Sequence, residues 1–214
     1  MSDTQLRGPL WGGQGTAAPF TGTYSGAQRV SDAHGRFTDA VLSGRTFYLS
    51  ASAATATAYV GAAAGTPLIA VHNPVGSNKT VVGMMVSWAA RVGASAAGNG
   101  GIVAWAGPSV APTGTRTNPT NARSQAASGS AVLGFVNAAL TGSTALALAL
   151  PLIEYQMIGA TPVSQAIAPC MCDVGGLLVA DPGNQIAIGL SAALTSLTND
   201  IAFYWEEIPY QPAM

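Results

Sequence analysis

Residues 185–192 read QIAIGLSA, and this stretch decides the fold class of the chain. Ile186 and Ile188 alternate with the small residues Ala187 and Gly189. Successive side chains of a β-strand point to opposite faces, so the spacing predicts a strand with one bulky and one small face. A small, uncharged face lets another sheet or a backbone segment approach closely.

The same period recurs in residues 144–153, TALALALPLI, where leucines and alanines alternate. On a helix these leucines would be scattered, whereas on a strand they share one face. Turn sequences such as NPVGSN at 73–78 and DPGN at 181–184 separate short apolar runs of this kind. Strands are predicted at 46–53, 67–73, 80–92, 101–106, 131–138, 144–153, 176–181, 185–192 and 198–208. Short strands with such boundaries predict an all-β, antiparallel jelly-roll β-sandwich over residues 46–214.

Residues 1–45 differ from the rest of the chain, because they have no steady apolar period. They hold 7 of the 17 charged residues, together with isolated aromatic residues. We expect an extended N-terminal arm that anchors on a partner surface, with a flexible tail as the alternative. The predicted anchors are Arg7, Trp11, Phe20, Tyr24, Arg29 and Arg36.

The stretch AFYWEEIPY, residues 202–210, predicts a last strand that is apolar on both faces. Phe203 and Trp205 lie on one face, and Tyr204 and Ile208 lie on the other. A strand of this kind has protein on both sides, and in a single-domain sandwich the second layer must come from another subunit. We therefore predict that Phe203, Tyr204, Trp205 and Ile208 form the interface of a homotrimer.

Glu206 and Glu207 in the same strand raise the possibility of a catalytic carboxylate pair. Neighbouring strand residues point to opposite faces, so these two carboxylates cannot flank one bond. We expect each carboxylate to be paired or solvated at the end of the strand. Pro209 ends the strand because proline has no N–H to donate to the neighbouring strand.

The charge content excludes several classes of partner. Only 8% of the residues are charged and the net charge is -1, so little protects the surface against self-association. Lys79 is the single lysine, which leaves no basic surface for nucleic acid. No apolar run reaches the roughly 20 residues of a membrane-spanning helix. The start of the chain has no export signal, so we expect synthesis in the cytoplasm of the cell that makes it.

The remaining motifs predict no cofactor, no metal and no enzymatic activity. HNPVGSNKT, residues 72–80, ends like a phosphate-binding loop but lacks its glycines. Cys170 and Cys172 share one side of a strand and could ligate a metal only with His34 or His72, so idle thiols are favoured. No hydrolase motif surrounds either histidine.

Three stretches carry a resemblance to a known group: LIAVHNPVGSNKTVVGMMVSW at 68–88, GLLVADPGNQIAIGL at 176–190 and AFYWEEIP at 202–209. They resemble the jelly-roll or TNF-like β-sandwich proteins of tailed-bacteriophage virions, in particular head decoration (cement) proteins. The resemblance implies a non-enzymatic trimeric knob on the capsid exterior. Its partner would be the major capsid protein, whose neighbouring subunits the N-terminal arm clamps.

Two other classes remain open at this point. A carbohydrate-binding jelly roll, such as a phage fibre or receptor-binding tip, would use Trp88 or Trp105 as a stacking platform, although both fit a core position better. A catalytic sandwich would need clustered histidines and carboxylates, and the chain has only 2 histidines.

Overall fold

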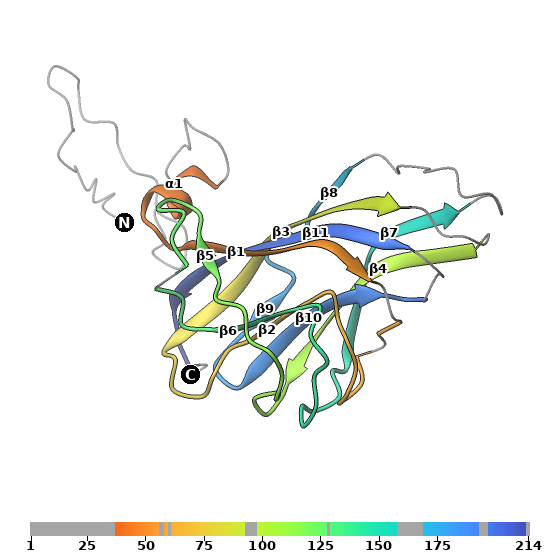
Figure 1. Ribbon diagram of the computed structural model, residues 1–214. Helices are drawn as coiled ribbons and strands as arrows, with labels where there is room; N and C mark the ends of the chain where they lie inside the picture. The colour runs from red at the N-terminus through yellow and green to blue at the C-terminus, as the bar shows by residue number, and fades with distance from the viewer. Residues whose placement is uncertain are drawn as a thin grey trace, which may run out of the picture. The chain divides into compact units, whose positions relative to one another are not determined.

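The computed structural model describes residues 37–55, 58–59, 61–92, 98–127, 129–157, 169–192 and 197–212 (Figure 1). The chain divides into two units, Met1–Asp39 and Ala40–Met214. The division falls before the predicted boundary at residue 45, because Ala40 is buried and Arg45 pairs with Glu206 of the sandwich. The six predicted arm anchors, Arg7 to Arg36, lie outside the described residues.

The described part of the chain is almost entirely strand, with one short helix, α1 (Thr38–Leu42). The strands are β1 (Thr46–Thr55), β2 (Ile69–His72), β3 (Lys79–Val92), β4 (Gly98–Pro108), β5 (Thr120–Asn121), β6 (Leu133–Val136), β7 (Leu148–Met157), β8 (Cys170–Asp173), β9 (Val179–Ala180), β10 (Asn184–Leu190) and β11 (Thr198–Pro209). All nine predicted strand regions contain a strand. The two-residue β5 and the edge strand β8 were not predicted.

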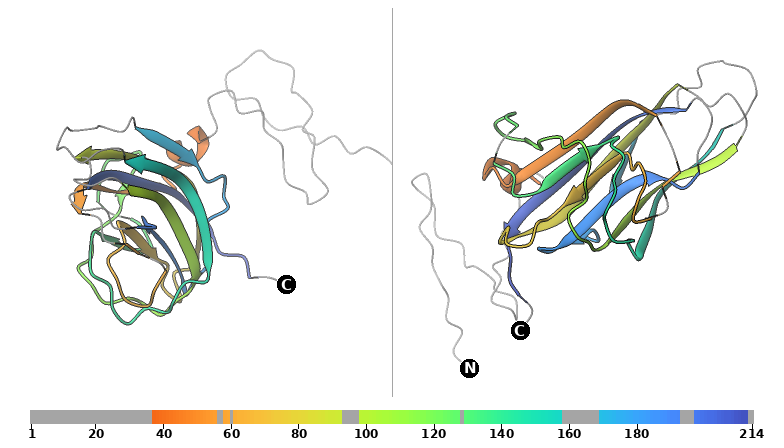
Figure 2. Two further views of the ribbon diagram at one scale, coloured as in Figure 1. Left: turned by 90° about the vertical axis from the view of Figure 1, so that its right-hand side faces the viewer. Right: turned by 60° about the horizontal axis from the view of Figure 1, so that its bottom comes forward.

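The strands form two antiparallel sheets that pack face to face (Figure 2). The first sheet has the order β5-β1-β11-β3-β8, with β9 also paired to β3, and the second has the order β6-β2-β10-β4-β7. The pairing is nested along the chain: β1 pairs with β11, β2 with β10, β3 with β8 and β9, and β4 with β7. Nested antiparallel pairing over two sheets is the jelly-roll topology, which confirms the predicted fold.

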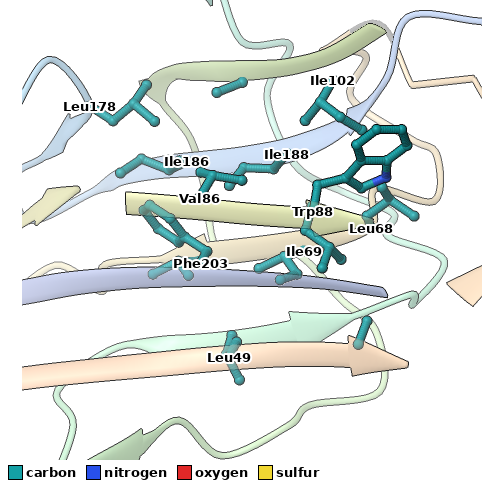
Figure 3. Packing of buried hydrophobic residues seen from close by; sticks show 14 of the residues in the cluster. Leu49, Leu68, Ile69, Val86, Trp88, Ile102, Leu178, Ile186, Ile188 and Phe203 are labelled. Atoms are coloured by element: carbon teal, nitrogen blue, oxygen red, sulfur yellow. The ribbon is translucent and has the colours of Figure 1, made fainter. Parts of the chain in front are cut away.

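The main core lies between the two sheets (Figure 3). Phe203 and Trp88 of the first sheet face Ile186 and Ile188 of the second, and none of the four is more than 2% exposed. Rings and branched chains of this size fill the space between stacked sheets, which lie about 10 Å apart. The bulky face that the alternation in QIAIGLSA predicts is therefore the face of β10 that lies in the main core.

A second, smaller core covers the outer face of the second sheet. It comprises Tyr59, Ala70, Trp105, Phe135, Ala138, Leu140, Leu146 and Ala187. Tyr59 packs edge-on against Trp105 and lies so close to Gly189 that a Cβ there would be 2.9 Å from the Tyr59 Cβ. The close approach expected over the small face of β10 is confirmed, and the chain's own residues make it.

Candidate interaction surface on the first sheet

The outer face of the first sheet is defined by the strand register. Leu49, Phe203 and Val86 point into the core, so their neighbours along each strand point outward. Cross-strand partners place these outward residues in two rows, Tyr48–Tyr204–Met85 and Ser50–Ala202–Ser87–Met171. Asp200 pairs with Ala89 in a third row, and the Ser52 side chain joins this row by a hydrogen bond to Asp200.

A ridge of two tyrosines crosses this face. The rings of Tyr48 and Tyr204 are stacked, with their centroids 5.5 Å apart and an interplanar angle of 29°. The hydroxyl of Tyr48 donates a hydrogen bond to Oε1 of Gln125 at 3.1 Å. Both tyrosines remain half-buried, so part of each ring faces outward.

A hollow lies next to the ridge, over the two rows of small residues. It has a volume of about 410 Å³, and Ser50, Ser52, Ser87, Ala89 and Ala202 line it. The Ser52 hydroxyl is 3.0 Å from Oδ1 of Asp200, to which it donates a hydrogen bond. These short side chains leave a depression beside the row of larger tyrosine side chains.

The surroundings of the ridge and hollow are mainly apolar. Met171, Leu177 and Val179 are 70%, 69% and 42% exposed. Met171 lies in β8, Leu177 in the segment between β8 and β9, and Val179 in β9, at the edge of this sheet. At the other end, Arg45 Nε and Glu206 Oε1 form an ion pair at 2.7 Å. Exposed apolar groups that adjoin one another mark interaction surfaces on soluble proteins.

The structure corrects half of the predicted trimer interface. Tyr204 and Ile208 lie on the outer face and are partly exposed, as an interface requires. Phe203 and Trp205, however, are 0% exposed within the chain's own core, so neither can contact a second copy. The reason is that one face of a sandwich strand must fill the space between the sheets, and Phe203 and Trp205 lie on that face of β11.

Glu206 and Glu207 point to opposite faces of the sheet, as predicted, so the two carboxylates cannot flank one bond. Glu206 pairs with Arg45 on the outer side. Glu207 is only 4% exposed and accepts hydrogen bonds from the Ser130 hydroxyl at 2.6 Å, the Ala131 N–H at 3.0 Å and the Trp205 Nε1–H at 3.3 Å. No sequence pattern identified Ser130 as its partner, because the loop and the strand are far apart in the chain.

The two cysteines lie on one side of the edge strand β8, opposite Trp88 and Val86 of β3. Both are free. Burial raises the pKa of the Cys172 thiol, and the charges of Asp173 and Cys170 raise it further. His72 lies on β2, in the other sheet, so it does not join them. In the ranges that the structure describes, no three His, Cys, Asp or Glu residues cluster as metal ligands.

Neither predicted sugar-stacking tryptophan is accessible. Trp88 is 2% exposed and donates a hydrogen bond from Nε1 to Oδ1 of Asn199 at 2.8 Å. Trp105 is 6% exposed and packs against Tyr59. The interpretation of both as core residues is confirmed.

Comparison with known proteins found no matching family model, no matching curated protein and no matching solved structure. Within the described ranges, no helix is long and apolar enough to cross a membrane.

Proposed function

We propose that this chain is a non-enzymatic structural protein of a bacteriophage virion, which decorates and cements the capsid exterior. It binds the major capsid protein as a homotrimer, and its N-terminal arm clamps neighbouring capsid subunits. The observation that carries the proposal is the outer face of the first sheet, which combines a tyrosine ridge, a hollow and an apolar edge.

The shape of this face favours a second copy of the chain as its occupant. A ridge and a hollow of this kind can fit together between copies, because the Tyr48–Tyr204 ridge of one copy can enter the Ser/Ala hollow of the next. The floor of the hollow carries one carboxylate, Asp200, which already accepts a hydrogen bond. In a cyclic trimer each contact joins two different parts of the surface, so a separate ridge and hollow suit that symmetry.

Trimerisation also supports attachment to a capsid. Three copies that bind together engage three sites on a symmetric scaffold, and the second and third contacts are effectively intramolecular. The low net charge of -1 is consistent with a chain whose surface is covered in its assembled state. Contacts from Arg7, Trp11, Phe20, Tyr24, Arg29 and Arg36 would then add to those of the sandwich.

The first test is the substitution Tyr204→Asp, which places a charge in the centre of the proposed contact. Burying an unpaired carboxylate costs several kcal/mol, so the trimer should dissociate. Light scattering should give three times the chain mass for the wild type and one chain mass for the variant. The variant should also lose co-sedimentation with capsid particles that lack the protein.

Thr115→Asp is the matched control, since Thr115 is exposed and lies outside the strands of the first sheet. It should leave both the mass and the co-sedimentation unchanged. A wild type that is a stable monomer, or a Tyr204→Asp variant that stays trimeric, would refute this interface.

A further inference from the structure

Met171 is the exposed methionine of the first sheet. It lies in the edge strand β8, and it is 70% exposed. By contrast, Met84 is only 6% exposed and Met85 is half-buried. An oxidant in solution must touch the sulfur atom to react with it, so of these three methionines Met171 is the one that reacts first.

Met171 also forms part of the hollow on the outer face of this sheet. Its cross-strand partner is Ser87, and the same row continues through Ala202 to Ser50. All four residues line the hollow. The other three have short side chains, so Met171 is the large and flexible member of this row.

The chemistry of a thioether suits the occupant proposed for the hollow, the Tyr48–Tyr204 ridge of a neighbouring copy. A methionine side chain is apolar and adapts its shape, and its sulfur packs favourably against aromatic rings. In the trimer proposed above, on which this inference rests, the ridge of one copy contacts Met171 of the next.

We propose that Met171 is an oxidative modification site whose state controls assembly of the trimer. A hydroperoxide transfers one oxygen atom to the thioether sulfur. The O–O bond breaks, an S–O bond forms, the sulfur loses two electrons, and the hydroperoxide is reduced to an alcohol, or to water if it is hydrogen peroxide. Methionine sulfoxide is polar. Its oxygen loses its hydrogen bonds to water when it is buried against the faces of tyrosine rings, so the oxidised copy stays out of the trimer.

The flanking cysteines are the competing targets of an oxidant. Cys170 and Cys172 point to the opposite face of β8 from Met171, because neighbouring strand residues alternate. Burial raises the pKa of the Cys172 thiol, which keeps it in the less reactive protonated form at neutral pH. Cys170 also lines the hollow, so the experiment must separate its oxidation from that of Met171.

The first measurement compares the full-length wild type with Met171→Leu and Met171→Gln in the absence of oxidant. Leucine has a similar volume and no sulfur, whereas glutamine is polar like the sulfoxide. Light scattering over a range of concentrations should show the same trimer for the wild type and Met171→Leu. Met171→Gln should associate at least about tenfold more weakly, the effect expected from burying one unpartnered polar group.

The second measurement treats the same proteins with hydrogen peroxide, and peptide mass spectrometry locates each added oxygen atom. Oxidation at Met171 should dissociate the wild-type trimer, and methionine sulfoxide reductases should restore it. Met171→Leu keeps both cysteines and should remain trimeric. Met171 should also react more slowly in the trimer than in Tyr204→Asp, because the subunit contact covers it.

The possible failures of this site and of the trimer are distinguishable. A wild type that stays trimeric with sulfoxide at Met171 would overturn the proposal and leave the trimer intact. The same holds if peroxide dissociates Met171→Leu as it does the wild type, since the cysteines would then be responsible. A wild type that is monomeric without oxidant would refute the trimer and this site with it.

Discussion

His72 and Glu207 are both buried ionisable residues, yet their surroundings differ. Glu207 accepts three hydrogen bonds, and these tie the Ser130 loop to β11. His72 has an unpartnered Nδ1 beside the unpartnered amide of Gln185. Burial disfavours the charged form of an imidazole, so it lowers the pKa of His72.

This difference predicts a pH dependence of stability that belongs to His72. Burial lowers its pKa in the folded state below the ordinary 6.5. Between the two pKa values the unfolded chain therefore binds more protons than the folded chain, and the free energy of unfolding falls as the pH falls. We expect a loss below pH 6.5 of about 1.4 kcal/mol for each unit by which the pKa is lowered.

The measurement is urea unfolding of the wild type and of His72→Gln at pH 7.5 and pH 5.5. The variant has no titrating group at this position, so its stability should change less between the two pH values. Taking the difference between the two proteins removes the contribution of His34. The same pH dependence in both proteins would show that His72 does not titrate in this way.

At the scale of single elements, glycines set how closely neighbouring segments pack. Gly134 in β6 faces Leu49 of β1, and a Cβ there would lie 2.5 Å from the Thr117 carbonyl oxygen and 2.7 Å from Leu49 Cδ1. The Thr117 N–H donates to the Gly134 carbonyl at 2.8 Å, so this backbone cannot simply move away. The absence of a side chain at Gly134 is thus a requirement of packing.

Gly134→Ala should consequently destabilise the sandwich by about 1–3 kcal/mol, the usual cost of overpacking. Gly107→Ala in β4 is the matched control, because its nearest contact would be an ordinary 3.5 Å to the Ala147 nitrogen. The free energies of unfolding, measured with urea, compare the two variants. A Gly134→Ala protein as stable as Gly107→Ala would mean that the neighbouring backbone yields at little cost.

At the scale of the whole molecule, the two outer sheet faces of the sandwich differ. The second sheet carries a small core made by Tyr59, Leu140, Leu146 and their neighbours, so the chain covers this face itself. On the first sheet, the Tyr48–Tyr204 ridge, the hollow and Met171 remain accessible in the described part of the chain. This asymmetry is what singles out the first sheet as the proposed subunit contact.

The proposed role of the arm is tested by deleting residues 1–36. The sandwich core lies entirely within Ala40–Met214, so the melting temperature should stay within a few degrees of the wild type. Co-sedimentation with capsid particles that lack the protein should be lost, because a segment that orders on docking contributes its anchors only there. A truncated protein that binds particles as well as the full chain would exclude the arm as the tether.

The sequence by itself determined the strands, their faces and the fold class. Alternation with a period of two is a local property of the sequence. It therefore shows which side chains of QIAIGLSA and TALALALPLI share one face of a strand, whatever that strand pairs with. The leucine prediction holds at Leu148 and Leu150, which pair with Ala106 and Ala104, up to the register shift near Pro151. It is wrong at Leu146, which precedes β7 and belongs to the smaller core on the outer face.

Only the tertiary structure decided which face is inside and what covers it. Phe203 and Tyr204 are adjacent aromatic residues of β11, and the packing of the second sheet places one in the core and the other outside. The pairing of His72 with Gln185 likewise depends on the register between β2 and β10. Such contacts join residues far apart in the chain, and no short sequence pattern contains both partners.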